Sequence, residues 1–117
     1  MTPPRSSPDI GLALTESTFC ILAALAEPRH GYAVMQWVLE ATGARVKLGP
    51  GTLYGALTTL TEKGLIALLG ERVEGSERRK VYALSESGRA CLQAEVVRLE
   101  AMTILGREAL RQTGGVR

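Results

Sequence analysis

Apolar residues recur every three or four positions in four stretches of the chain, which is the spacing of an amphipathic helix. The first stretch follows Thr15, a good helix cap, and predicts a helix over about Glu16 to Ala26 that Pro28 ends. A second helix is predicted over about Tyr32 to Thr42, where Gly43 stops it. The expected buried faces are Phe19, Leu22 and Ala26, flanked by Ile21 and Leu25, and then Tyr32, Met35 and Leu39, with Val34 and Val38 beside them.

The third stretch, residues 49–66, reads GPGTLYGALTTLTEKGLI and has the clearest boundaries in the chain. Pro50 suits the first helical position, where its missing amide hydrogen has no partner to lose. Gly64 suits the left-handed residue that ends many helices. One stripe of this predicted helix is aliphatic and should face the core: Leu53, Ala56, Leu57 and Leu60. The remaining side is nearly uncharged and should face outward: Gly51, Tyr54, Gly55, Thr58 and Glu62.

Two strands and a long final helix complete the predicted elements. The strands cover about residues 66–72 and 79–84, and the charged, glycine-containing segment between them indicates a hairpin. Ser85 is the expected cap of the final helix, which should reach about Gln112. A helix of about 27 residues is about 40 Å long, which exceeds the body of so small a domain. We therefore expect a second copy of the chain on its apolar stripe, which comprises Leu92, Val96, Leu99, Met102, Leu105 and Ala109.

The length of 117 residues and an apolar content of 45% fit one compact, helix-rich domain. We divide the chain into a flexible tail (1–8), a body that begins with an N-terminal arm (9–84), the final helix (85–112) and a second flexible tail (113–117). The formal net charge is only +2. A mild excess of basic over acidic residues between Arg45 and Lys80 matters more, because the position of charge decides what a surface attracts.

Several residues with reactive side chains are expected to be structural. Cys20 and Cys91 lie in separate apolar stretches without metal-binding spacing, so we expect reduced core thiols. His30, the single histidine, should be a hydrogen-bonding group in a turn, and Trp37 a partly buried packing residue, with a dimer contact or a ligand pocket as the alternatives. No catalytic pair, phosphate-binding loop or metal-ligand spacing is present, so an enzyme is the weakest function class, and no metal or cofactor is expected.

The apolar run at residues 19–26 is much shorter than the roughly 20 residues that a membrane-spanning helix requires. No basic leader with a cleavage site precedes it. We therefore expect a cytoplasmic protein that does not associate with a membrane.

Three short helices, a hairpin and a trailing helix are the order of a winged helix-turn-helix, a mainly α fold with a small β-hairpin. In that fold the third helix enters the DNA major groove and the hairpin contacts the flanking backbone. Tyr54 is the best single contact candidate, with packing against the hairpin or a neighbouring helix as the alternative. Because the outer face of the third helix is almost uncharged, affinity must come largely from cations around it. The candidate DNA contacts are Lys47, Pro50, Gly51, Thr52, Tyr54, Gly55, Thr58, Thr59, Lys63, Arg72, Arg78, Arg79 and Lys80.

Four segments together resemble the PadR family of transcriptional regulators in its short form: HGYAVM at 30–35, LGPGTLYGALTTLTEKGLI at 48–66, RRKVYALSESGR at 78–89 and the long final helix. The resemblance implies a homodimeric DNA-binding regulator, usually a repressor, and a pseudo-palindromic operator in double-stranded DNA. It places the dimer interface on the final helix and the N-terminal segment, so we add Leu12 and Phe19 to the apolar stripe named above. Some family members sense small molecules near that interface, although no motif here identifies an effector.

A second interpretation stays open, in which the winged helix binds a protein instead of DNA. The sparse charge on the outer face of the third helix is the reason to keep it. Salt-insensitive association with a protein would favour this alternative, whereas DNA affinity that falls steeply as salt rises would favour a regulator.

Overall fold

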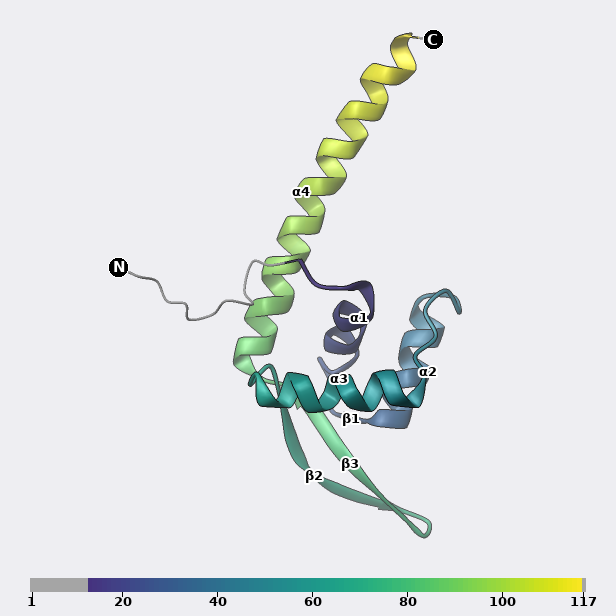
Figure 1. The fold of residues 1–117 in the computed structure, drawn as a ribbon, viewed down its shortest axis with the longest axis vertical. Helices are drawn as coiled ribbons and strands as arrows, with labels where there is room; N and C mark the ends of the chain where they lie inside the picture. Colours follow the sequence, from purple (N-terminus) through teal and green to yellow (C-terminus); the bar gives the residue numbers. More distant parts are fainter. Residues whose placement is uncertain (1–12, 117) are drawn as a thin grey trace, which may run out of the picture.

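The computed structural model describes residues 13–116, with side chains for residues 13–112. The elements follow the chain in the order α1 (Glu16–Ala24), β1 (Arg29–His30), α2 (Gly31–Ala41), α3 (Pro50–Glu62), β2 (Ile66–Glu74), β3 (Glu77–Leu84) and α4 (Glu86–Val116). The first three helices form a body from which the β2–β3 hairpin and α4 project in opposite directions (Figure 1). This arrangement confirms the predicted mainly α, winged helix-turn-helix fold with a long final helix.

The predicted caps are present at the helix ends. The Thr15 hydroxyl accepts an amide hydrogen of the first turn of α1 at 3.1 Å, and the Ser85 hydroxyl does the same for α4 at 3.0 Å. Pro50 is the first residue of α3. Gly64 follows α3 with a φ of 76°, a left-handed conformation that glycine adopts without strain. Sequence rules for helix ends therefore hold at the elements that position the site.

Two helix boundaries differ from the prediction. Helix α1 ends at Ala24 instead of Ala26, and the Arg29 side chain donates a hydrogen bond to the Ala24 carbonyl at that end. Helix α4 continues to Val116 instead of ending near Gln112. The backbone of residues 113–116, which the sequence placed in a flexible tail, is thus helical, because the penalty for glycine in a helix is only about 1 kcal/mol.

The sheet has three antiparallel strands in the order β1-β3-β2, rather than the two of the predicted hairpin. Strand β1 pairs Arg29 with Tyr82 and His30 with Val81. Strands β2 and β3 pair from Ile66 and Leu84 at the base to the tip of the hairpin, with an irregularity at Leu69. We call residues 66–84 of this hairpin the wing. A two-residue strand is too short to produce a periodic pattern, which is why the sequence did not predict β1.

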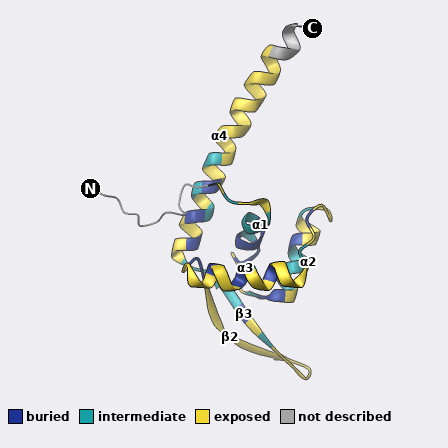
Figure 2. Ribbon diagram, in the orientation of Figure 1, coloured by how far each residue is buried: buried dark blue, intermediate teal, exposed yellow. Residues whose placement is uncertain are grey.

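The core lies where α1, α2, α3 and the start of α4 meet (Figure 2). The predicted stripe of α3 is confirmed, since Leu53, Leu57 and Leu60 are buried and Ala56 is partly buried against the core. The predicted face of α2 is wrong: the fully buried residues are Val34 and Val38, whereas Tyr32 and Leu39 are exposed and Met35 is partly buried. In α1 the buried set is Cys20, Ile21, Leu22 and Ala24, while Phe19 is partly buried and Ala26 is exposed.

The end of α3 is joined directly to the start of α4. The Ser85 hydroxyl donates to the Gly64 carbonyl at 2.6 Å, and the Ser85 amide donates to the Leu65 carbonyl at 3.1 Å. Gly88 packs so closely on this junction that an added Cβ would lie 1.9 Å from the Leu65 carbonyl oxygen. The absence of a side chain at Gly88 therefore permits the contact between the two helices.

The reactive side chains expected in the core lie there. Cys20 and Cys91 are buried and form no disulfide within the described residues, and burial raises the pKa of the Cys20 thiol. Trp37 is partly buried against the core, with the Arg29 guanidinium 5.3 Å from its ring centroid. Between residues 13 and 116 no helix combines the length and the apolar character needed to cross a membrane.

Candidate nucleic-acid interface

Helix α3 presents a continuous exposed face on the side away from the core. Leu53, Leu57 and Leu60 hold the helix against the body, and this anchoring fixes which residues face outward. The residues that the sequence predicted for this face are all exposed: Gly51, Tyr54, Gly55, Thr58 and Glu62. The other candidate DNA contacts on or next to α3 are exposed as well: Pro50, Thr52, Thr59 and Lys63. Most side chains on this face are small and several carry hydroxyl groups, so another surface can approach the helix closely.

Tyr54 combines the two roles that the sequence left as alternatives. Its side chain lies so close to the first residue of α2 that a Cβ added to Gly31 would be 2.7 Å from the Tyr54 hydroxyl oxygen. Tyr54 nevertheless keeps 48% of its surface exposed. The ring is therefore positioned by a backbone contact with Gly31 and still available to a partner.

A groove of about 430 Å³ joins the exposed face of α3 to the wing. It brings two residues of α3 together with the start of α2 and with the cationic part of β3. The lining residues are His30, Gly31, Tyr32, Tyr54, Thr58, Glu77, Arg78, Arg79, Lys80 and Tyr82. The fold thus unites the two regions that the sequence predicted separately as DNA contacts.

The remaining candidate cations lie outside this groove. Lys47 lines a neighbouring hollow with Tyr32 and Leu48. Lys63 lies at the opposite end of α3, where it lines a hollow with Thr15 and Thr18. The sequence did not predict Thr15 and Thr18 as part of this surface, because only the fold brings the start of α1 beside α3.

The arginines of the wing are paired with carboxylates of the same hairpin. Arg78 contacts Glu71 at 3.0 Å, and Arg72 contacts Glu74 at 3.8 Å. Arg79 lies 3.4 Å from Glu74 and 3.3 Å from Glu77. Lys80 makes no ion pair with any residue in the described part of the chain. The positive charge available to an anion is therefore smaller than the count of basic residues indicates.

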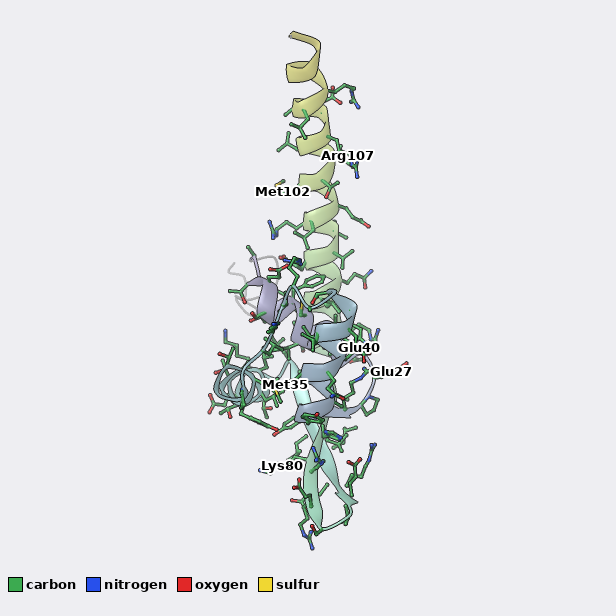
Figure 3. All side chains as sticks on the ribbon, turned by 90° about the vertical axis from the view of Figure 1, so that its right-hand side faces the viewer. Glu27, Met35, Glu40, Lys80, Met102 and Arg107 are labelled. Atoms are coloured by element: carbon green, nitrogen blue, oxygen red, sulfur yellow. The ribbon has the colours of Figure 1, made fainter. Side chains whose placement is uncertain are left out.

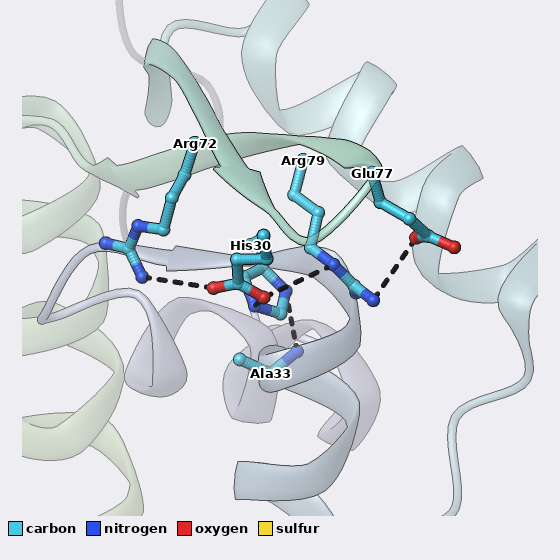
Figure 4. A network of polar contacts seen from close by, with 6 residues as sticks. His30, Ala33, Arg72, Glu77 and Arg79 are labelled. Carbon is cyan, nitrogen blue, oxygen red and sulfur yellow. Dashed lines mark hydrogen bonds and ion pairs between the residues drawn. The ribbon is translucent and has the colours of Figure 1, made fainter.

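His30 has the structural role that the sequence predicted. Its Nδ1 atom accepts the Ala33 amide hydrogen at 3.2 Å and so caps α2. Its Nε2 atom faces Glu74 of the wing at 3.7 Å. The side chain is largely buried at the point where β1 joins α2. Figure 4 shows this contact set, which the sequence did not predict because its members come from three elements.

A second surface runs along α4, where residues 99–112 are all exposed (Figure 2). The predicted stripe begins with the partly buried Leu92 and continues along the exposed part of the helix. Partly buried Phe19 of α1 lines a hollow with Val96 and Leu99. The exposed members of the predicted stripe are Val96, Leu99, Met102, Leu105 and Ala109. Leu12, which was predicted for the same interface, lies outside the described residues.

Glu95 links this surface to the N-terminal side of the body. It is only 3% exposed, forms hydrogen bonds of 2.9 and 2.7 Å with Arg98, and accepts the Leu14 amide hydrogen at 3.1 Å. The Arg98 guanidinium, aided by the Leu14 amide, holds the pKa of the Glu95 carboxyl below its usual range despite burial. Glu95 thus remains a charged group inside the fold.

Residues 21–94 match the PadR-like family of transcriptional regulators. The chain belongs to the PadR-like family. The match includes the complete α2, α3 and wing, and therefore the groove described above. A PadR family transcriptional regulator from Eggerthella lenta DSM 2243 has the same fold, with 26% identity, a TM-score of 0.68 and 80% of each chain covered.

Two further comparisons place this PadR-like chain among its relatives. The fold of Bacillus subtilis PadR, solved in complex with operator DNA, matches 71% of this chain and 48% of that one, with 24% identity and a TM-score of 0.64. An uncharacterized 37.1 kDa protein in transposon TN4556 of Streptomyces fradiae is 38% identical over 81 residues. The match covers 68% of this chain and 22% of that relative, so the chain spans about a fifth of its length.

Proposed function

We propose that this chain is a sequence-specific DNA-binding transcriptional regulator that acts as a homodimeric repressor in the cytoplasm. The main observation in favour is the groove that unites Tyr54 and Thr58 of α3 with Arg78 and Lys80 of the wing. A helix with small and hydroxyl-bearing residues reads base edges in the major groove, while nearby cations neutralise phosphates. Membership of a family of transcriptional regulators supports the same role.

Operator DNA in the Bacillus subtilis PadR structure supports double-stranded DNA as the partner. We propose direct contacts from the exposed face of α3 and from the cations around it. Lys47 and Lys63 lie beside the two ends of α3 and extend the cationic border beyond the wing. The proposed contacts on α3 and around it are Lys47, Pro50, Gly51, Thr52, Tyr54, Gly55, Thr58, Thr59, Lys63, Arg72, Arg78 and Lys80.

A genomic selection followed by a salt titration tests this proposal. Purified protein is mixed with sheared genomic DNA, the bound fragments are sequenced, and the affinity for a selected fragment is measured by fluorescence anisotropy. We expect a pseudo-palindromic site, and an affinity that falls about 1,000-fold or more between about 50 mM and about 200 mM salt. Tyr54→Ala should weaken binding to the selected fragment. The alternative of a protein-binding winged helix would be favoured if no fragment were enriched and a protein bound independently of salt.

The homodimer is proposed because an apolar stripe on α4 lies beyond the reach of its own body. Met102, Leu105 and Ala109 are exposed, and a stripe of this kind usually marks an interface. Figure 3 shows Met102 and Arg107 on different sides of the helix. An isologous pairing of two α4 helices would cover the apolar side and present two recognition helices to a symmetric site.

A small-molecule effector is also proposed, in a hollow of about 430 Å³ beside the stripe. Phe19, Cys20 and Leu99 contribute apolar surface, while the Glu16–Arg45 and Glu95–Arg98 pairs supply charged groups. Compounds such as phenolic acids should then release the protein from its fragment in the anisotropy assay. Arg45→Ala removes a cation of this hollow and should abolish release without changing basal DNA affinity. Release that persists in this variant would place the effector elsewhere.

The role of a regulator without enzymatic activity agrees with the family to which the chain belongs. Repression is tested by placing the selected fragment between a promoter and a reporter gene. Expression of the protein should lower reporter output, and an increase would identify an activator.

A further inference from the structure

Four residues connect the wing to the start of α2: Glu74, Arg79, His30 and Tyr32. One of them, Glu74, is acidic although the wing is proposed to face DNA. Glu74 lies at the end of β2, yet its Oε1 atom is 3.7 Å from His30 Nε2 and 3.4 Å from Arg79 Nε. The Arg79 guanidinium in turn lies 5.6 Å from the ring centroid of Tyr32 on α2. Figure 4 shows His30 and Arg79 within one set of polar contacts. The wing is therefore fastened to α2 by side chains as well as by the sheet.

The register of the hairpin separates this contact set from the other charges of the wing. Arg72 pairs with Arg79 across the strands and Glu74 pairs with Glu77, so these four residues share one face. Glu71 pairs with Lys80, and Val73 pairs with Arg78, on the opposite face. The first face meets His30 and Tyr32, whereas the Glu71–Arg78 pair forms no ion pair with α2 in the described part of the chain.

Arg79 differs from the other basic residues of the wing in its surroundings. Its side chain is 29% exposed, against 75% for Arg78. Two carboxylates and one aromatic ring surround its guanidinium, and its Nε atom is buried. A phosphate would have to displace these neighbours to reach it, so Arg79 is better suited to hold the wing than to bind DNA.

The start of α2 also positions α3, which completes a connection from the wing to the recognition surface. His30 caps α2 through the Ala33 amide. The next residue, Gly31, lies directly against the Tyr54 ring of α3. A displacement of the wing relative to His30 and Tyr32 would thus change its position relative to Tyr54.

We propose that Glu74 and Arg79, held by His30 and Tyr32, are positioning residues that set the wing against the recognition helix. Glu74 is then required for specific DNA binding, although its negative charge opposes DNA. This inference rests on the proposed DNA-binding function. Arg79, which the sequence grouped with the direct DNA contacts, acts through Glu74 and Tyr32 instead.

Matched variants of two acidic residues on the same strand test the proposal. Glu74→Ala and Glu71→Ala remove the same charge, but only the first breaks the link to α2. On the fragment selected by the wild-type protein, we expect Glu74→Ala to bind about tenfold more weakly. Glu71→Ala should bind equally well or more tightly, because it releases Arg78. On a scrambled duplex of equal length, neither variant should bind more weakly than the wild type.

Variants of the partner residues separate positioning from charge. Tyr32→Phe keeps the ring under the Arg79 guanidinium and should retain binding, whereas Tyr32→Leu should lose about as much affinity as Glu74→Ala. The double variant Glu74→Ala/Arg79→Ala should be no weaker than either single variant, because residues that act as one unit are not additive. Tighter operator binding by Glu74→Ala, at the level of Glu71→Ala, would overturn the proposal.

Hydrogen exchange on the DNA-free protein gives a readout that does not depend on DNA binding. Glu74→Ala should speed exchange of the Ala33 amide and of the wing amides about tenfold relative to the wild type, and Glu71→Ala should not. Unchanged exchange in Glu74→Ala would overturn the positioning role. If the wild type selected no DNA but the exchange result held, the proposed function would fail while the positioning role remained.

Discussion

Gly55 lies in the middle of α3, where glycine weakens a helix relative to alanine. A Cβ added to Gly55 would meet no atom within 4 Å. Nothing in the packing of the described chain therefore requires glycine at this position. The proposed contact of α3 with the major groove of DNA does offer a reason, since a helix backbone approaches DNA most closely where side chains are absent.

Gly55→Ala is expected to separate stability from function. The variant should be more stable by about 0.5–1 kcal/mol in urea unfolding, because alanine loses less backbone freedom than glycine on folding. Its affinity for the selected fragment should fall at least about fivefold, the size of a small mismatch penalty. Equal or tighter binding would remove Gly55 from the interface.

The charges of the wing show what the sequence predicts at the scale of residues and what it does not. Arg78, Arg79 and Lys80 are adjacent in the sequence, which alone gives them equal standing as DNA contacts. The register of β2 and β3 places Arg79 beside Glu74 and leaves Arg78 largely exposed. Which carboxylate meets which cation depends on strand pairing and side-chain direction, and neither can be read from residue order.

At the scale of elements, prediction succeeded where a residue has one physical role. Pro50 and Gly64 fixed the ends of α3 because each suits one helix position. Periodicity could not choose the buried face of α2, because Val34 and Val38 form a stripe adjacent to that of Tyr32 and Leu39. Packing against α1 and α3 decided between two stripes that are equally apolar in the sequence.

Gly88 is expected to be the glycine least tolerant of substitution in the described chain. Gly88→Ala would place a methyl group against the Leu65 carbonyl oxygen and force the start of α4 away from α3. We expect a loss of about 3 kcal/mol in the free energy of unfolding, measured with urea. Gly55→Ala is the matched control, because the same substitution there meets open space. A change below about 1 kcal/mol in Gly88→Ala would show that the junction adapts without strain.

Glu95 predicts how stability changes with acid. Its pKa in the folded protein is lowered by Arg98 from an ordinary value of 4.5, so its stabilisation is complete above that pH and is lost as the pH falls through the lowered value. Glu95→Gln should therefore be less stable than the wild type at pH 7, and the difference should shrink in acid. Urea unfolding at fixed protein concentration measures this. Glu40→Gln removes one exposed carboxylate and is the control for the change in net charge.

At the scale of the whole molecule, the length of α4 is the dominant feature. The molecule extends 63 Å along its longest axis, and residues 99–112 of α4 are all exposed (Figure 1). The sequence predicted this outcome from length alone, since no body of this size covers so long a helix. It did not predict Glu95, whose contact with Leu14 ties α4 to residues before α1.

Met102→Asp is expected to separate the proposed dimer into monomers. An aspartate at the centre of the apolar stripe would bury an unpaired charge, and light scattering at micromolar concentration should then report a single chain. Affinity for the selected fragment should fall about 100-fold, because the two half-sites would no longer be bound together. Arg107→Asp changes charge by more but lies on another side of the helix, and it should stay dimeric (Figure 3). A dimeric Met102→Asp would move the interface elsewhere.

The junction at Gly64, Ser85 and Gly88 has a mechanical consequence for such a dimer. Hydrogen bonds and close packing restrict movement of the end of α3 relative to the start of α4. In the proposed dimer each α4 would therefore move together with the α3 of its own chain, and the contact between the two α4 helices would set their relative orientation. A small change in the angle between the two α4 helices would then change the distance between the two α3 helices. Only one such distance matches the helical repeat of DNA.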